Sequence, residues 1–363
     1  MLNYFDTRTR IITLAAVGAS LAALVLRIGG AGGVAIFAAS SIGLAGLAAM
    51  VGEGTEQLSH RLGPKATGVL QSGLGNLPEF FIGTFALKAG LLDVVRAALV
   101  GSVLANTLLV LGLAFIAGGL RHGPQKFGTD QTKMMATLLV LAAAAIAIPT
   151  IATAPGGPAR GHETELSVVV SVVLLVVFAA SIPFSVARTS GGAAPDAAAL
   201  AGDGEATWPL WVAAATLLAA GVGAAFVSDW FVDALKPAMS SLGMSEAFAG
   251  LVVVAIAGNA VENVVGVRAM LADKGDLAIS VILNSSLQVA LALVPILVLL
   301  SLVLGGATLT LVVSPLLVAA LALTVVLAAL VVIDGESTWL EGVALVGLYV
   351  ILAASVWWGQ PIG

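Results

Sequence analysis

The stretch GNLPEFFIG at residues 75–83 returns 183 positions later as GNAVENVVG at residues 258–266. Each copy places one acidic residue, Glu79 or Glu262, inside an otherwise apolar run long enough to be a membrane helix. A charge near the centre of a bilayer costs at least ~2.5 kcal/mol on insertion scales, so an ionisable residue kept there indicates a functional site. Two such acids in the same local sequence favour a protein that binds a cation.

Composition predicts the class of protein. Hydrophobic residues make up 60% of the 363 positions and charged residues only 10%, which is too little polar surface for a water-soluble globule of this size. We therefore expect an all-α polytopic membrane protein whose surroundings are the lipid bilayer. The net charge of -5 is scattered without a basic block, so nucleic acid is not expected as a partner. Cysteine is absent, which excludes disulfides, thiolate metal sites and thiol catalysis.

Apolar runs of the length needed to cross ~30 Å of hydrocarbon predict about 11 transmembrane helices. Their approximate limits are 11–26, 33–51, 66–88, 94–118, 132–152, 164–187, 208–228, 245–272, 277–304, 310–333 and 338–358. A membrane β-barrel would need short segments of alternating polarity, and the sequence has none. The connections that an inside N-terminus makes cytoplasmic hold ten Lys and Arg against five on the other side. This bias predicts a cytoplasmic N-terminus.

The chain divides at a long polar connection. Residues 188–207 are rich in Gly, Ala and Pro and are expected to form a cytoplasmic linker. This gives an extra N-terminal helix in residues 1–30, a first five-helix repeat in 31–187 and a second in 208–363. Because each half has an odd number of spans, the second enters the membrane the opposite way up, which is the inverted-repeat plan of many secondary transporters. The first helix lacks a cleavage site and the composition is rich in Ala, Gly and Val, so we expect a bacterial or archaeal plasma membrane.

The repeat keeps a constant register without gaps over about thirty positions. The matched pairs are Gly75 with Gly258, Asn76 with Asn259, Glu79 with Glu262, Gly83 with Gly266, Asp93 with Asp276, Ser102 with Ser285 and Leu104 with Leu287. Two inverted copies are expected to bring Glu79 and Glu262 together near the midplane, where repeat transporters place substrate and coupling ions.

Helical spacing suggests why these residue types recur. Gly75, Glu79 and Gly83 would share one helix face, so that each acid is flanked by positions that let a neighbouring helix approach closely. Simple helix packing explains the glycines equally well. Asn76 precedes the acid by three residues and can offer a side-chain oxygen nearby. Pro78 removes a backbone donor, so it should bend the span and free a carbonyl, that of Leu74.

The oxygen-rich ligand set indicates the class of ion. Carboxylates, amide oxygens and freed carbonyls suit a hard cation such as Ca²⁺, which takes six to eight oxygen ligands. No His or Cys lies near the motif, which argues against Zn²⁺ or Cu⁺. The same carboxylates can bind protons instead, because burial and mutual repulsion disfavour two neighbouring charges. We expect protons and the cation to compete for one site.

These segments resemble the cation/Ca²⁺ exchanger superfamily, and most closely its Ca²⁺/H⁺ exchanger (CAX) family. The resemblance covers nearly the whole chain beyond the first helix. The segments that carry it are TEQLSHRLGP at 55–64, GNLPE at 75–79, GSVLANTLLVLG at 101–112, SDWFVDAL at 228–235 and SEAFAGLVVVAIAGNAVE at 245–262. The resemblance implies that Glu79 and Glu262 carry Ca²⁺ and protons in alternation. It implies further that Asn76 and Asn259 belong to the same motifs and that Ser102, Asn106, Ser285 and Gln288 line the site from adjoining helices.

Some residues depart from the proton-coupled pattern. Pro78 before the acid is more typical of the Na⁺/Ca²⁺ branch, and Asn263 stands where many proton-coupled members have His. The second repeat nevertheless lacks the Thr/Ser-rich and Asp character expected of the Na⁺ branch. Asn106 and Gln288 could equally form hydrogen bonds between helices.

Three further acids are weaker candidates for ion vestibules. Glu56 and Asp229 precede the motif helix of each half, where solvation at the membrane interface also explains them. Glu246 follows Ser245 at a helix start, where an N-cap and a first-turn acid need no further role.

We therefore expect a secondary active transporter, not an enzyme, that exchanges Ca²⁺ for H⁺ and needs no cofactor. The alternative is Na⁺/Ca²⁺ exchange through the same site, and a cation channel is a remote alternative. An intramembrane metalloprotease is disfavoured because the three His lie in connections and no HExxH pair exists. The sequence leaves open whether the chain forms a homo-oligomer.

Overall fold

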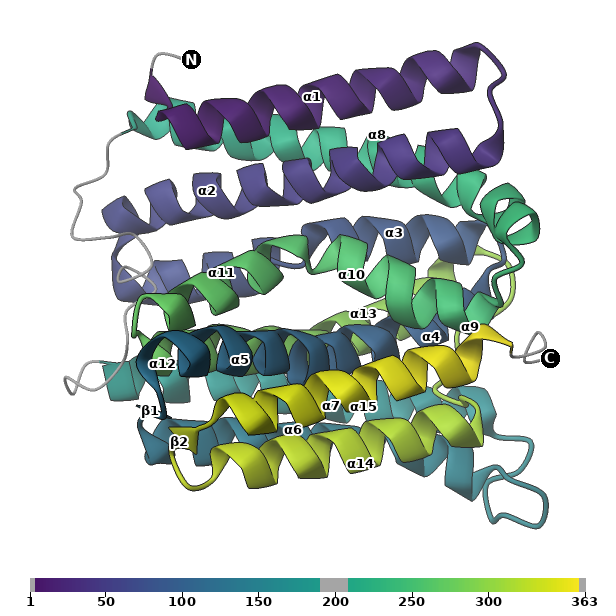
Figure 1. The fold of residues 1–363 in the computed structure, drawn as a ribbon. Coiled ribbons are helices and arrows are strands. Elements are labelled where there is room, and N and C mark those ends of the chain that lie inside the picture. Colours follow the sequence, from purple (N-terminus) through teal and green to yellow (C-terminus); the bar gives the residue numbers. More distant parts are fainter. Residues whose placement is uncertain (1–3, 190–207, 359–363) are drawn as a thin grey trace. The chain divides into compact units, whose positions relative to one another are not determined.

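The computed structural model describes residues 4–189 and 208–358 (Figure 1). Within these ranges the side chains of 59–73, 183–189 and 261–262 lie outside the description. The expected linker at 188–207 falls almost entirely outside the described residues and stays a prediction. The described chain is helical apart from one short two-stranded ribbon, which confirms the all-α class.

The helices form two compact units. Unit 1 comprises residues 1–85, 182–244 and 257–261, and unit 2 comprises 86–181, 245–256 and 262–363. Each unit takes helices from both predicted repeats, because the chain crosses from one unit to the other several times. The two repeats are therefore similar in sequence, but neither of them forms a compact unit of its own.

Unit 1 is built on α1 (Thr7–Ile28), α2 (Gly33–Leu74) and α8 (Leu210–Leu242), with α1 and α8 both packed along α2 (Figure 1). Small residues allow the close packing, since a Cβ at Gly46 would lie 2.6 Å from the Cβ of Ala16. At one end, the ring of Phe5 stacks on that of Trp208 with centroids 4.4 Å apart.

The helix α2 corrects one expectation about the connections. It continues through residues 52–65, where the sequence predicts the link between the second and third spans. Polar residues after the apolar run have partners within unit 1, which lets the helix extend beyond that run. Gln57 donates to Glu53 at 3.5 Å, and its side-chain oxygen accepts the backbone N–H of Trp208 at 3.3 Å.

Unit 2 holds the remaining helices and the ribbon. Its first-half elements are α4 (Leu92–Leu104), η2 (Ala105–Val110), α5 (Leu111–His122), β1 (Gln125–Lys126), α6 (Thr129–Ala152) and most of α7 (Glu163–Thr189). Its second-half elements are α9 (Glu246–Phe248), η4 (Ala249–Val254), most of α11 (Ala260–Leu271), α12 (Gly275–Gln288), η5 (Val289–Leu293), α13 (Val294–Leu304), α14 (Pro315–Val332), β2 (Glu336–Ser337) and α15 (Trp339–Trp357). Among the described helices, α7 and α11 also contribute residues to unit 1, and two further helices are divided between the units, α3 (Leu77–Lys88) and α10 (Ala255–Gly258).

The ribbon joins the two halves of the chain within unit 2. Strands β1 and β2 pair antiparallel, with Gln125 opposite Ser337 and Lys126 opposite Glu336. The ammonium of Lys126 lies 3.1 Å from the Glu336 carboxylate, on the exposed side of the ribbon.

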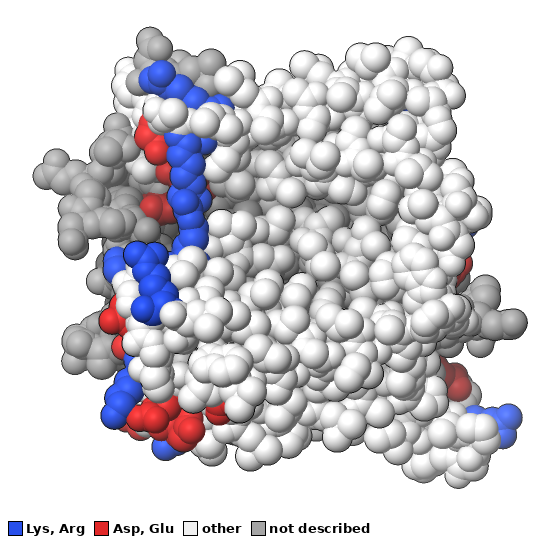
Figure 2. Space-filling model, in the orientation of Figure 1, with Lys and Arg blue, Asp and Glu red and all other residues white. Residues whose placement is uncertain are grey.

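The described helices have the length and polarity of membrane spans. Nine of them qualify, or ten if the bent pair Glu246–Gly258 and Asn263–Leu271 counts as one. The expected count of about 11 includes the span at 66–88, part of which lies among residues whose side chains are not described. On the face drawn in Figure 2, charged side chains gather beside helix ends and the middles of the described helices carry uncharged residues. The protein is an integral membrane protein.

Candidate ion-binding site

Both copies of the repeated motif interrupt a helix at the same residue. In the first copy α2 ends at Leu74 and α3 begins at Leu77, and in the second α10 ends at Gly258 and α11 begins at Ala260. An Asn therefore stands directly before each new helix. Asn is among the preferred N-cap residues, and Gly is the residue most often found where a helix ends. The dipeptide Gly-Asn is thus typical of a helix end followed by a restart, whereas the sequence pattern predicts a packing role for the Gly and a ligand role for the Asn.

The break changes the surroundings expected for the first acid. Glu79 lies in the first turn of α3, and not in the middle of an unbroken helix. The prediction that Gly75 shares one helix face with Glu79 is wrong, because the chain leaves the helix between them; Glu79 and Gly83 remain in one helix. The first turn of a helix offers N–H groups without helical partners and the positive end of the helix dipole, both of which favour a negative charge.

Pro78 fits this restart. It is the second residue of α3, where the missing N–H would have no partner within the helix in any case. The bend predicted at this proline is confirmed as an interruption of the helix just before it, at Gly75 and Asn76. The α3 helix then starts regularly, with the N–H of Phe80 donating to the carbonyl of Asn76 at 2.9 Å.

Unit 1 brings the first acid against the second motif. A Cβ added to Gly258 would collide with Cγ of Glu79 and would lie 3.0 Å from its Cδ and 3.2 Å from Oε1. Glu79 is 6% exposed, and Asn76 and Asn259 are buried as well. The repeated Gly-Asn of the second half therefore lies beside the carboxyl group of the first. Only glycine leaves room for this contact.

The second acid has no described side chain. Glu262 is the third residue of α11, the place that Glu79 has in α3. Its side chain lies outside the described residues, so its expected meeting with Glu79 stays a prediction.

The four polar residues of the adjoining helices are all buried in unit 2: Ser102, Asn106, Ser285 and Gln288. The amide of Asn106 donates to the hydroxyl of Ser285 at 2.9 Å, which links η2 of the first half to α12 of the second. The hydrogen bonding between helices that was weighed for Asn106 is therefore present. Such a bond also fixes where the two side chains point, and their place beside an ion path stays a prediction.

A feature that the sequence analysis missed lies at the same positions. The α-helix changes to a π-helix at η2 and again at η5, which begin at Ala105 and Val289. These two segments occupy nearly matching places in the repeat, beginning three residues after Ser102 and four residues after Ser285. The π-helix is rare and is found often at functional sites. No spacing of apolar residues in the sequence distinguishes it from an α-helix, so the sequence carries no signal for it.

The vestibule candidates have structural surroundings of their own. Asp229 accepts from Arg27 of α1 at 3.4 Å, and Asp233, one turn further along α8, lies 2.6 Å from the same guanidinium. Glu246 is the first residue of α9, whose N-cap Ser245 accepts the N–H of Phe248 at 3.0 Å. Glu56 is half-buried on α2. An ion pair thus accounts for Asp229 and a helix start for Glu246, while a vestibule role for any of the three stays a prediction.

A buried carboxyl beside a broken helix, in a chain of two similar halves, is the arrangement of an ion-coupled carrier. The model of the family described as sodium/calcium exchanger protein matches residues 32–187 and 212–358, which is most of the chain and leaves the first helix and linker out. The chain belongs to this family.

Its relatives include proteins named as antiporters and exchangers. The chain is 33% identical over 333 residues to a Ca²⁺/H⁺ antiporter of Aphanothece halophytica, with 88% of this chain and 89% of the relative covered. It is also 33% identical over 320 residues to the Ca²⁺/H⁺ antiporter ChaA of Bacillus subtilis, covering 88% and 90%. A vacuolar cation/proton exchanger of Oryza sativa is 30% identical over 331 residues, covering 88% and 79%.

Solved structures share the fold. The native structure of YfkE matches with a TM-score of 0.81 and 29% identity, covering 95% of this chain and 99% of that one. The H⁺/Ca²⁺ exchanger CAX matches with a TM-score of 0.75 at 15% identity, covering 96% and 92%, and the sodium-calcium exchanger NCX_Mj with 0.57 at 18%, covering 94% and 98%. The last two show likeness of fold alone.

Proposed function

We propose that this protein is a secondary active transporter that exchanges Ca²⁺ for H⁺ across a membrane. The observation that carries the proposal is the buried carboxyl of Glu79 in the first turn of α3, pressed against Gly258 of the second motif. The relatives named as Ca²⁺/H⁺ antiporters cover most of this chain, which supports the choice of proton over sodium as the coupling ion. The chain acts as a carrier and not as an enzyme.

The proposed ligands are all oxygen atoms. Glu79 and Glu262 supply carboxylates, and Asn76 and Asn259 supply amide oxygens from the positions where the two helices restart. A hard divalent cation such as Ca²⁺ prefers such a set, and its flexible coordination tolerates ligands from several elements. Ser102, Asn106, Ser285 and Gln288, with their π-helical neighbours, are proposed to form the walls of the ion path.

Exchange follows from competition for the carboxylates. Ca²⁺ binding needs both acids charged, and protonation removes that charge and releases the cation. The first turn of α3 favours a negative charge on Glu79, and in this buried position a bound Ca²⁺ or a proton would neutralise that charge. The neutral state after Ca²⁺ release therefore requires protons, which couples the two fluxes in opposite directions.

The setting of this exchange is also proposed. The excess of Lys and Arg on one set of connections supports a cytoplasmic N-terminus. The relative in Bacillus subtilis, together with the composition, supports a bacterial or archaeal plasma membrane.

The test is Ca²⁺ uptake into vesicles that contain the purified protein, driven by an imposed pH gradient. We expect Glu79→Gln, which keeps shape and removes charge, to reduce uptake to background. Glu165→Gln is the matched control, because the Glu165 side chain is 71% exposed on α7, and it should transport like the unchanged protein. Substantial uptake by Glu79→Gln would refute the proposed role of this carboxyl.

The coupling ion is tested separately. With the pH clamped equal on both sides, a Na⁺ gradient should drive no Ca²⁺ uptake. Ca²⁺ flux that requires Na⁺ would show that the coupling ion is Na⁺ and not H⁺. This is the alternative that Pro78 before the acid favours in the sequence. Ca²⁺ uptake that needs neither a pH gradient nor a Na⁺ gradient and does not saturate with Ca²⁺ concentration would indicate a channel.

A further inference from the structure

The helices α4 and α12 start in matching ways. Asp93 lies in the first turn of α4 and Asp276 in the first turn of α12, and the two residues correspond in the 183-residue repeat. Both helices belong to unit 2 and run on into the polar positions described above, α4 to Ser102 and Asn106 and α12 to Ser285 and Gln288. The way in which each start is held therefore affects where those side chains lie.

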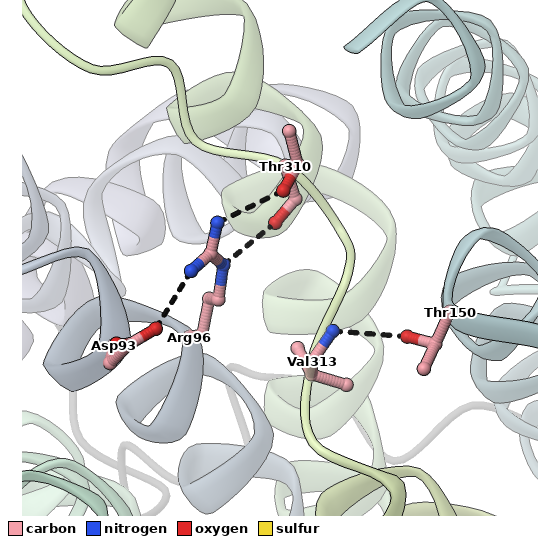
Figure 3. Close-up of polar contacts among 5 residues, drawn as sticks. All are labelled: Asp93, Arg96, Thr150, Thr310 and Val313. Atoms are coloured by element: carbon pink, nitrogen blue, oxygen red, sulfur yellow. Dashed lines mark hydrogen bonds and ion pairs between the residues drawn. The ribbon is translucent and has the colours of Figure 1, made fainter. Parts of the chain in front are cut away.

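The start of α4 is bonded to a segment of the second half. The guanidinium of Arg96 donates to Asp93 at 2.7 Å, to the carbonyl of Thr310 at 3.1 Å and to the Thr310 hydroxyl at 2.9 Å (Figure 3). Thr310 lies in the non-helical segment between α13 and α14. We call Asp93, Arg96 and Thr310 the first latch.

The same non-helical segment is bonded to other helices of unit 2. The hydroxyl of Thr150 in α6 accepts the N–H of Val313 at 3.0 Å (Figure 3) and donates to the carbonyl of Leu311 at 3.2 Å. The hydroxyl of Ser167 in α7 accepts the N–H of Leu311 at 2.9 Å. Polar side chains thus satisfy backbone groups that no helix pairs, as buried irregular backbone in a membrane protein requires.

The start of α12 is bonded to a segment of the first half. The carboxylate of Asp276 accepts the backbone N–H of Gly128, which lies between β1 and α6. Just before α12, the carboxylate of Asp273 accepts from the side chain of Gln125 at 2.6 Å. We call Asp276 and Gly128 the second latch. Gly128 lies between α5 and α6, and Thr310 lies between α13 and α14, so each latch joins the start of one helix to a connection at the matching place in the element order of the other half.

We infer that Arg96 and Asp276 are positioning residues that hold the starts of α4 and α12, and through them the polar side chains of the ion path. The two latches lie at opposite ends of unit 2, because α4 begins at the right of Figure 1 and α12 at the left. The first half uses an Arg to span the distance to Thr310, whereas in the second half the carboxylate reaches a backbone N–H directly. The KM measurement described below rests on the proposed function, whereas the hydrogen-exchange measurement does not.

The latches are tested first without transport, by hydrogen exchange on the full-length protein. We expect Arg96→Gln to speed exchange of the amides at 309–313 by about tenfold, because a hydrogen bond to a charged group stabilises a segment against local opening by a factor of about this size. The exchange rates at 125–128 should stay within about twofold of those in the unchanged protein. Asp276→Ala should speed exchange at 125–128 and leave 309–313 unchanged. Faster exchange in both segments, or in neither, would overturn the inference whatever the protein transports.

Transport then separates positioning from folding. Because the polar side chains would lose their fixed places, Arg96→Gln should raise the KM for Ca²⁺ by about three- to tenfold and keep the maximal rate within about twofold. Arg96→Lys should restore part of the affinity, because the ammonium keeps the charge without the planar fork. The controls are Arg160→Gln and Asp130→Ala, at exposed positions.

A structural role alone predicts something different, namely less protein in the membrane with an unchanged KM. If Arg96→Gln does not reach the membrane, Thr310→Val removes a single bond of the first latch and should shift both measurements in the same direction by a smaller factor. If the unchanged protein shows no flux driven by pH, the proposed function fails while the exchange experiment still decides the latches.

Discussion

The two motif helices reach the same interruption with different residues. In the first half Pro78 follows the Asn by two positions, and in the second half the matching residue is Val261. Both helices nevertheless restart directly after the Asn. The second break therefore forms without a proline, and the Gly-Asn pair is the feature that the two breaks share. In both halves a glycine lies at the end of one helix and an asparagine directly before the next, and these are residue types preferred at those places.

The comparison also separates the two glycines. Gly258 lies against the side chain of Glu79, so its missing Cβ is part of the environment of the acid. Its counterpart Gly75 is half-buried, at the end of a helix whose preceding side chains are not described. The halves are thus alike in backbone plan, while the described contact runs from the first acid to the second glycine.

The largest effect is expected at Gly258. We predict that Gly258→Ala lowers Ca²⁺ uptake more than tenfold, because the new methyl group must displace the Glu79 side chain, and overpacking of this kind costs about 1–3 kcal/mol. The measurement is pH-driven uptake, with the folded amount read from the chromatographic profile. Gly18→Ala is the control, since a Cβ there meets nothing within 4 Å on α1. Normal uptake by Gly258→Ala would show that the contact has no bearing on the site.

A medium effect is expected where the halves meet in unit 2. Asn106→Ala and Ser285→Ala each remove the 2.9 Å hydrogen bond, and each variant should raise the KM for Ca²⁺. The double variant should be no worse than the poorer single one, with a coupling energy of about 0.6–1.5 kcal/mol. A double-mutant cycle on KM measures this coupling. Strict additivity would mean that the two side chains act independently.

The smallest effect is expected at Pro78. Pro78→Val gives the first motif the residue of the second, and we predict uptake within about twofold of the unchanged protein because the Gly-Asn break remains. The same vesicle assay tests it, repeated with a Na⁺ gradient at clamped pH. A large loss of transport would show that the two halves differ in what holds the break. A gain of Na⁺-driven uptake would make residue 78 a determinant of the coupling ion.

Much of the molecule could be predicted from the sequence. Hydrophobic content set the membrane class, because a bilayer accepts only backbone whose polar groups are paired within the protein, and long apolar runs then become helices. The repeated GNLPE and GNAVE indicated which residues matter, because a buried acid is too costly in lipid to be kept without a role. The family followed from the same segments and is confirmed by the comparisons.

Contacts across long sequence separations could not be predicted. That Gly258 lies against Glu79, that Asn106 bonds to Ser285, and that Arg96 reaches Thr310 depend on how helices far apart in the chain pack together. Periodicity reports which face of a helix is apolar and says nothing about which neighbour covers it. In the same way, no apolar spacing predicts the extension of α2 past its apolar run or the π-helical segments that follow Ser102 and Ser285. The sequence by itself therefore determined the membrane class, the family and the residues of the repeated motif. Only the tertiary structure decided which side chains those residues contact, because such contacts depend on the packing of helices far apart in the chain.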